Sequence, residues 1–240
     1  MSITVAIKTF ERPLCLEKCL GSIREHYPDI PILVADDSRE PSSGLMWQYK
    51  AVNAAPSGEF DIGLSAGRNA LVQNCDTEFI FIVEDDMVFT AETDLEKLVL
   101  EMPEYDILGA QLLRPDGSLQ SYEGWMTERE DGEGKLLVMY RFAIAETAPC
   151  EIICNCFLAR TQTLNDVPWD EDLKIMEHED YFWRAKKAGV RVGFSPQVRI
   201  LHERGHRPEG YGEYRNRRVN HFQAIARAKH GWIDSTWVTM

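Results

Sequence analysis

The chain has 240 residues, enough to bury a substantial core, and its 44% hydrophobic residues without repeats or low-complexity tracts exclude a disordered or fibrous protein. Its formal net charge of -13 argues against non-specific binding to nucleic acid. No apolar run approaches the roughly 20 residues of a membrane-spanning helix, and the six cysteines form no CxxC pair, so we expect mostly buried, reduced thiols.

The first half alternates short apolar runs with helical patterns. Strands are predicted at 3–7, 30–36 and 79–85, and helices at 13–27, 64–74 and 90–102. Pro13 suits the first turn of a helix. This alternation predicts a mostly parallel sheet with helices on both faces, and ligands of such sheets bind beyond the carboxyl ends of the strands.

The second half is less regular. The predicted strands are 105–113, 136–145, 151–160 and 190–202, and the predicted helices are 178–189 and a basic segment at 214–231 followed by a Trp-containing tail. The stretch 114–135 is rich in Gly and acidic residues, which favours a mobile loop.

Polar clusters follow the three predicted strands of the first half: "KTFER" (8–12), "ADDS" (35–38) and "VEDD" (83–86). The last contains Glu84, Asp85 and Asp86, which cannot all be ionised and buried without a compensating cation. Mg²⁺ or Mn²⁺ is suitable because both prefer oxygen ligands. Alternate side chains of an extended segment point the same way, so Glu84 and Asp86 face one ligand and Asp85 faces elsewhere. A solvated strand end or a helix N-cap is the alternative.

Six motifs follow one another along the chain: "KTFER", "ADDS", "GLSAGRN", "VEDDMVF", "NCFLAR" and "HEDYF". Together they resemble the GT-A glycosyltransferases of the large inverting class (family 2-like), in particular the catalytic domain of β-1,4-N-acetylgalactosaminyltransferases, over roughly residues 3–230. The resemblance implies an α/β GT-A fold in one domain over 1–240, whose mostly parallel central sheet is flanked by helices. A Rossmann-like nucleotide-binding half would occupy 1–105, and an acceptor half ending in the basic helix would occupy 106–240.

The resemblance also implies a metal site. "EDD" is similar to the family's DxD motif, with Glu84 where Asp is usual. Asp86 would bind the metal that holds the donor diphosphate, whereas Glu84 or Asp85 would contact the ribose or the water shell of the metal. His202 would be an additional metal ligand, although a histidine after a strand is more often a surface or core residue.

Five further residues would bind the nucleotide under this resemblance. Asp36 or Asp37 would hydrogen-bond the uracil edge, and Thr9 and Arg12 would line the base and ribose site. Arg68 would reach the nucleotide, with a structural salt bridge to one of the carboxylates as the alternative.

The stretch "MEHEDYFWR" (176–184) predicts a second chemical centre. The resemblance places a catalytic carboxylate at the N-terminus of this helix, where the helix dipole stabilises an anion. We expect Asp180 to be the general base. Glu179 lies about 100° away around the helix, so only one of the two can serve. Acidic residues that merely complement the helix dipole are the alternative.

Three other features need an interpretation. "HERGH" (202–206) matches the HExxH pattern of zinc peptidases, but Gly205 inside it and Pro208 after it argue against the helix that such a site requires. Trp125 is expected to stack on an acceptor sugar. The basic segment either closes over the donor diphosphate or is a solvated helix surface; its arginines are Arg204, Arg207, Arg215, Arg217 and Arg218.

The resemblance thus implies a metal-dependent inverting glycosyltransferase that uses Mn²⁺ or Mg²⁺ and a UDP-sugar donor such as UDP-GalNAc, UDP-GlcNAc, UDP-Gal or UDP-Glc. The acceptor would be a glycan, a glycolipid or another hydroxyl compound, with no nucleic-acid partner and no membrane span. Alternatives are a non-catalytic nucleotide- or glycan-binding module, a zinc peptidase, and a nucleotidyltransferase, against which the lack of an N-terminal Gly-rich phosphate loop counts. The first residues look like a strand rather than a signal peptide, so we expect a cytoplasmic protein. This expectation covers both a free protein and one that is peripheral at the inner membrane face.

Overall fold

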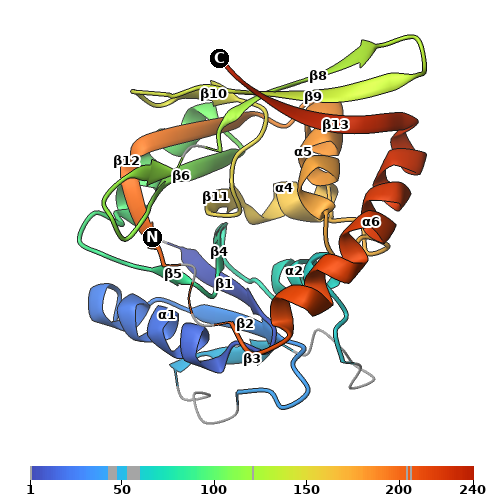
Figure 1. Ribbon diagram of the computed structural model, residues 1–240. Helices are drawn as coiled ribbons and strands as arrows, with labels where there is room; N and C mark the ends of the chain where they lie inside the picture. The colour runs from blue at the N-terminus through green and yellow to red at the C-terminus, as the bar shows by residue number, and fades with distance from the viewer. Residues whose placement is uncertain (1, 43–47, 53–59, 121, 204, 206) are drawn as a thin grey trace.

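Figure 1 shows the computed structural model of the chain, which describes residues 2–42, 48–52, 60–120, 122–203, 205 and 207–240. A large sheet contains the strands β1 (Ile3–Thr9), β2 (Ile32–Asp36), β3 (Lys50–Val52), β4 (Phe79–Glu84), β5 (Met87–Val88), β6 (Ile107–Leu113), β7 (Leu119–Gln120), β10 (Ala148–Cys150), β11 (Phe157–Arg160) and β12 (Val192–His202). Its order is β10-β12-β6-β11-β4-β1-β2-β3, with β5 paired to β12 and β7 paired to β6.

Helices cover this sheet on both sides. They are α1 (Pro13–His26), α2 (Leu64–Gln73), α3 (Leu95–Glu101) with the 3-10 turn η2 (Met102–Glu104), α4 (Thr161–Asp166), α5 (Glu177–Lys187) and α6 (Tyr211–His230). The predicted strands and helices of the first half are confirmed, with β1 parallel to both β2 and β4. The short helix α4 was not predicted. No helix in the described part of the chain is long and apolar enough to cross a lipid bilayer.

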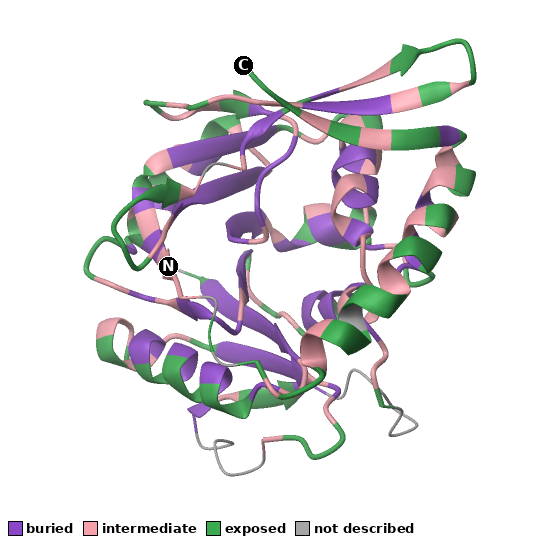
Figure 2. Ribbon diagram, viewed as in Figure 1, coloured by how far each residue is buried: buried purple, intermediate pink, exposed green. Residues whose placement is uncertain are grey.

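The two faces of the large sheet carry separate hydrophobic clusters, because successive residues of a strand point to opposite sides. In β4, Ile80 and Ile82 pack with the cluster that includes α2, α4 and α5, whereas Phe81 packs with α1 and α3. Both faces are therefore buried, which explains why β4 reads as a continuous apolar run (Figure 2).

The sheet is mixed rather than uniformly parallel in the second half. Strand β11 runs antiparallel to both β4 and β6, whereas β12 is parallel to β6. The predicted strand 151–160 is wrong for its first part, because only Phe157–Arg160 forms β11 and the preceding residues include just an isolated bridge at Ile152. No disulfide joins any of the six cysteines, and five of them are buried.

A second, three-stranded sheet packs beyond the edge of the first and has the order β13-β9-β8. Its strands are β8 (Gly124–Glu130), β9 (Lys135–Arg141) and β13 (Trp232–Thr239). The prediction of a mobile loop at 114–135 is wrong, because β8 pairs antiparallel with β9 along its whole length. The Trp-containing tail forms β13, which runs parallel to β9 after the long connection through α6 (Figure 1).

Trp232 attaches β13 to the body of the molecule. It is 5% exposed, its ring meets that of Trp183 edge-on at 6.0 Å between centroids, and its Nε1 donates to Glu128 at 2.9 Å. We predict that Trp232→Ala lowers the free energy of unfolding by about 3–5 kcal/mol, the usual cost of truncating a buried large aromatic residue. Urea denaturation followed by circular dichroism measures this change. The next residue, Ile233, is 37% exposed, so Ile233→Ala is the control, with an expected loss of about 1 kcal/mol or less. Equal losses for both variants would show that the packing of Trp232 does not hold β13 in place.

Candidate active site

The carboxyl ends of β1, β2 and β4 lie side by side at one edge of the large sheet (Figure 1). The register pairs Lys8 of β1 with Glu84 of β4, and Thr9 of β1 with Asp36 of β2. The polar residues that follow three separate apolar runs therefore meet at one place. Open α/β sheets bind their ligands at this edge.

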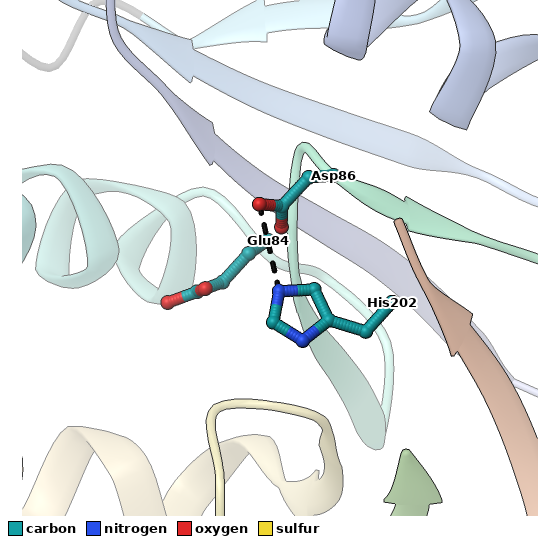
Figure 3. Close-up of side chains that lie close together, drawn as sticks. All are labelled: Glu84, Asp86 and His202. Atoms are coloured by element: carbon teal, nitrogen blue, oxygen red, sulfur yellow. Dashed lines mark ion pairs between the residues drawn. The ribbon is translucent and has the colours of Figure 1, made fainter. Parts of the chain in front are cut away.

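A metal-ligand group, Glu84, Asp86 and His202, forms there: each residue offers a ligand atom, and these atoms lie within 4.8 Å of one another (Figure 3). His202 reaches the group because the end of β12 pairs with β5. Its Nε2 lies 3.5 Å from Asp86 Oδ2, while the buried Oδ1 of Asp86 has no hydrogen-bond partner. Two carboxylates, one imidazole and an unused buried oxygen fit Mn²⁺ or Mg²⁺.

Asp85 faces away from the metal-ligand group. It accepts a hydrogen bond from Thr9 Oγ1 at 2.7 Å and lies 3.2 Å from the Arg12 guanidinium. Burial raises its pKa to about 7, although Arg12 and Thr9 partly oppose the shift.

Burial would also raise the pKa of Asp86, but His202 and Arg12 outweigh it and hold this pKa well below its usual range. Asp86 is therefore ionised at neutral pH. Thr9 and Arg12, expected at the base and ribose, contact these carboxylates.

The two carboxylates expected at the uracil edge are held by the protein itself. Asp36 accepts hydrogen bonds from the backbone N–H groups of Ser38 and Ser42, both at 3.0 Å. Asp37 is buried in an ion pair with Lys8. Both residues thus shape the loop after β2.

A hollow beside this edge lies between the ends of β1 and β2 and the first half of α6, and we call it the α6 hollow. Its lining includes Phe10, Asp61, Tyr211, Tyr214 and Arg218. The rings of Phe10 and Tyr214 are nearly parallel, at 23° with centroids 6.1 Å apart. Tyr214 Oη donates to Asp61 at 2.8 Å, and Arg218 forms an ion pair with the same carboxylate. Aromatic faces beside a carboxylate and cations suit a flat polar ring such as a nucleobase.

Among the side chains of α6 that the structure describes, Tyr211, Tyr214 and Arg218 line this hollow. Arg218 lines it, whereas Arg217 forms an exposed ion pair with Glu213. Arg204 lies outside the described residues.

Arg68 is buried, at 2% exposure, and forms an ion pair with Glu177 at the start of α5. Its other terminal nitrogen lies 3.5 Å from Glu84 Oε1. Burial would raise the pKa of Glu177, but Arg68 outweighs it and the pKa is lowered. The guanidinium therefore joins α2, β4 and α5 as a structural bridge, which is the alternative considered for it.

The start of α5 turns Glu179 and Asp180 in different directions. Glu179 lines the cleft beside the metal-ligand group, and burial raises its pKa. Asp180 is 1% exposed and does not line this cleft. Its Oδ1 lies 2.7 Å from His230 Nε2, and its Oδ2 accepts a hydrogen bond from Arg184 Nε at 2.9 Å. Both oxygens of Asp180, the expected base, therefore contact protein groups, whereas Glu179 faces the cleft.

The cleft has a volume of about 260 Å³ and brings Glu84 and His202 together with Glu179. Sequence reasoning missed the other residues of its lining, among them Gln120, Tyr122, Asn155 and His178, although the last two lie inside the motifs "NCFLAR" and "HEDYF". The Nδ1 of His202 lies 3.1 Å from Gln120 Oε1, which orients the imidazole.

Asn155 lies between Glu84 and His178 in the lining of the cleft. Its Nδ2 is 3.5 Å from Glu84 Oε1, and its Oδ1 is 3.2 Å from His178 Nδ1. Burial lowers the pKa of His178 to about 4, so this imidazole is neutral at physiological pH.

Two further expectations do not fit the structure. Trp125 lies on β8, stacks on Phe142 and lines a different cavity, so it is outside this cleft. His202, the first histidine of "HERGH", belongs to strand β12 rather than to a helix, which removes the geometry of a zinc peptidase; His206 lies outside the described residues.

The chain is similar in sequence to known glycosyltransferases. The chain is 32% identical over 207 residues to β-1,4 N-acetylgalactosaminyltransferase 2 of Mus musculus and 31% identical over 210 residues to β-1,4 N-acetylgalactosaminyltransferase 1 of Homo sapiens. These alignments cover 84% and 83% of this chain but only 39% and 38% of those proteins.

Solved structures share the fold. A mannosyltransferase from Pyrobaculum calidifontis in complex with GDP-Man and Mn²⁺ matches 95% of this chain and 64% of its own, with a TM-score of 0.60 at 15% identity. Residues 1–349 of S. aureus TarS match 85% of this chain and 60% of their own, with a TM-score of 0.60 at 17% identity. The family model for glycosyl transferase family 2 matches residues 4–163. The chain is therefore a member of glycosyl transferase family 2 and has the GT-A fold.

Proposed function

We propose that the chain transfers a hexose or N-acetylhexosamine from a UDP-sugar to a hydroxyl acceptor, with Mn²⁺ or Mg²⁺ and with inversion at the anomeric carbon. The observation that carries this proposal is one cleft lined by both Glu84 and His202 of the metal-ligand group and by the carboxylate of Glu179. A divalent cation bound there would stabilise the charge of the departing diphosphate.

The residues of the chain divide the remaining work. The α6 hollow accepts the nucleobase between aromatic side chains, at the same sheet edge as the metal-ligand group. Glu179 accepts the proton of the acceptor hydroxyl as that oxygen attacks the anomeric carbon, and its burial favours this role because a raised pKa makes a carboxylate a stronger base. Attack opposite to the leaving group inverts the anomeric configuration.

UDP-GalNAc is the first donor to test, because the mouse and human relatives are named as N-acetylgalactosaminyltransferases. UDP-GlcNAc, UDP-Gal and UDP-Glc share the same nucleotide and form the rest of the panel. GDP-Man, which the P. calidifontis mannosyltransferase holds, tests whether the site selects uracil over guanine as the nucleobase. The acceptor is proposed to be a glycan, a glycolipid or another hydroxyl compound.

The first prediction concerns the donor and the metal. The protein should bind UDP in the presence of Mn²⁺ and slowly hydrolyse at least one UDP-sugar, as measured by calorimetry and by release of UDP. Asp86→Asn should lower Mn²⁺ affinity at least tenfold, since it removes an ionised ligand. Binding of UDP without hydrolysis or transfer from any donor would instead support a non-catalytic module, and absence of UDP binding would contradict the proposal.

The second prediction separates the two acidic residues of α5. Glu179→Gln should lower kcat by about a thousandfold, within the range of general acid–base catalysis, while UDP and Mn²⁺ bind as before. Asp180→Asn should lower the melting temperature, because it weakens the contacts to His230 and Arg184, and should leave kcat of the folded protein within about tenfold of the wild type. Loss of kcat in Asp180→Asn alone would contradict the assignment of Glu179.

The third prediction is a pH dependence. The base must be deprotonated, and burial raises the pKa of Glu179 above its ordinary value. Therefore kcat/KM should fall as the pH drops through a pKa higher than the roughly 4.3 of a free glutamate. In Glu179→Gln this acidic limb should disappear from the residual rate. An unchanged limb in this variant would assign the titration to another group.

A further inference from the structure

Arg12 occupies an unusual position between the metal-ligand group and the α6 hollow. It is the N-cap residue of α1, in the turn between β1 and α1, and its side chain is 8% exposed. One terminal nitrogen lies 3.2 Å from Asp85 Oδ1, and the other lies 2.7 Å from Asp86 Oδ2. On its other side the guanidinium lies 6.0 Å from the ring of Tyr211, which lines the α6 hollow.

The guanidinium is bound to the oxygen that also faces His202. Asp86 Oδ2 contacts both Arg12 and His202, whereas Asp86 Oδ1 is unpaired. Arg12 therefore supplies the positive charge that the two buried aspartates need in the absence of other cations. A divalent cation held by the metal-ligand group would stand beside this guanidinium, and two like charges at such a distance inside a protein repel one another.

The hydrogen bonding of Arg12 is incomplete. Its buried Nε has no hydrogen-bond partner among the described residues. A guanidinium that serves only as a structural counterion normally satisfies its five N–H donors, and an orphaned buried donor calls for an explanation. An oxygen-rich anion in the adjoining hollow would supply the missing acceptor, and arginine suits phosphate because its planar fork donates two parallel hydrogen bonds.

We propose that Arg12 is an exchangeable counterion that couples metal binding to nucleotide binding. In the free protein it neutralises Asp85 and Asp86 and so opposes metal binding. A nucleoside diphosphate that extends from the α6 hollow to the metal-ligand group brings negative charge past Arg12, which moves from Asp86 to the phosphate oxygens and leaves the carboxylate to the cation. The inference rests on the proposed function, because it requires a nucleotide and a metal in these two places.

Mn²⁺ binding without any sugar transfer tests the proposal. The free Mn²⁺ signal in electron paramagnetic resonance is titrated with the wild type alone, with UMP and with UDP. UDP should raise the Mn²⁺ affinity of the wild type by about tenfold or more, within the range of site-to-site coupling, and UMP, which lacks the second phosphate, should raise it less. Calorimetric titration of UDP with and without Mn²⁺ should give the same factor, since coupling is reciprocal.

Arg12→Met then removes the charge and keeps most of the apolar stem. Without nucleotide, this variant should bind Mn²⁺ about tenfold more tightly than the wild type, and the further gain from UDP should shrink. Arg191→Met is the matched control: it removes the same charge from an exposed pair with Asp106 and should behave as the wild type. If Arg12→Met does not fold, Arg12→Met combined with Asp85→Asn restores the charge balance and gives the same comparison.

The outcomes separate this inference from the proposed function. If the wild type binds neither UDP nor Mn²⁺, the proposed function itself fails. If it binds both, but Arg12→Met and the double variant leave Mn²⁺ affinity and the effect of UDP unchanged, Arg12 is a fixed structural counterion and the inference is overturned while the proposed function stands.

Discussion

The arrangement of the site depends on buried carboxylates that are balanced by buried cations at one sheet edge. Three bridges supply this balance: Lys8 with Asp37, Arg12 with Asp85 and Asp86, and Arg68 with Glu177 and Glu84. Each bridge joins segments that are distant in sequence. Removal of one partner would leave an uncompensated charge in a poorly hydrated place. The free-energy cost of that buried charge is far larger than the net stability that the intact bridge contributes. The acidic edge is thus maintained by the same contacts that hold the surrounding elements together.

The sequence predicted the first half of the fold well because its strands are buried on both faces. Such strands appear as uninterrupted apolar runs, and the parallel arrangement places their polar ends together without further information. The small sheet was not predicted for the opposite reason. The strand β8 has only two large apolar residues, Trp125 and Met126, and ends in polar and charged ones. It pairs with β9, which in turn pairs with β13, a strand distant in sequence. Local patterns contain no information about such distant pairing.

The candidate site shows the same limit at the scale of single side chains. The sequence predicted that Glu84, Asp86 and His202 lie together, and the structure brings them together because they stand at or just after strand ends. The motif favoured Asp180 over Glu179, but which of the two faces the cleft depends on how α5 is rotated about its axis. That rotation is set by Tyr181 and Phe182 packing in the core and by His230, which approaches Asp180 from α6. Partners 50 residues apart are not visible in a motif of nine residues.

The long helix α6 has a mechanical consequence. Its first half is fixed by the contacts of Tyr214 and Arg218 with Asp61, and its last residue contacts Asp180 of α5. Its 20 residues span roughly 30 Å, and β13 continues from its end into the small sheet (Figure 1). A stiff rod that is anchored at both ends cannot shift at one end alone. The helix α6 therefore sets the distance between the two regions that it contacts. A ring that inserts beside Tyr214 would push on α6 and, through the contact at its end, on α5, which carries Glu179.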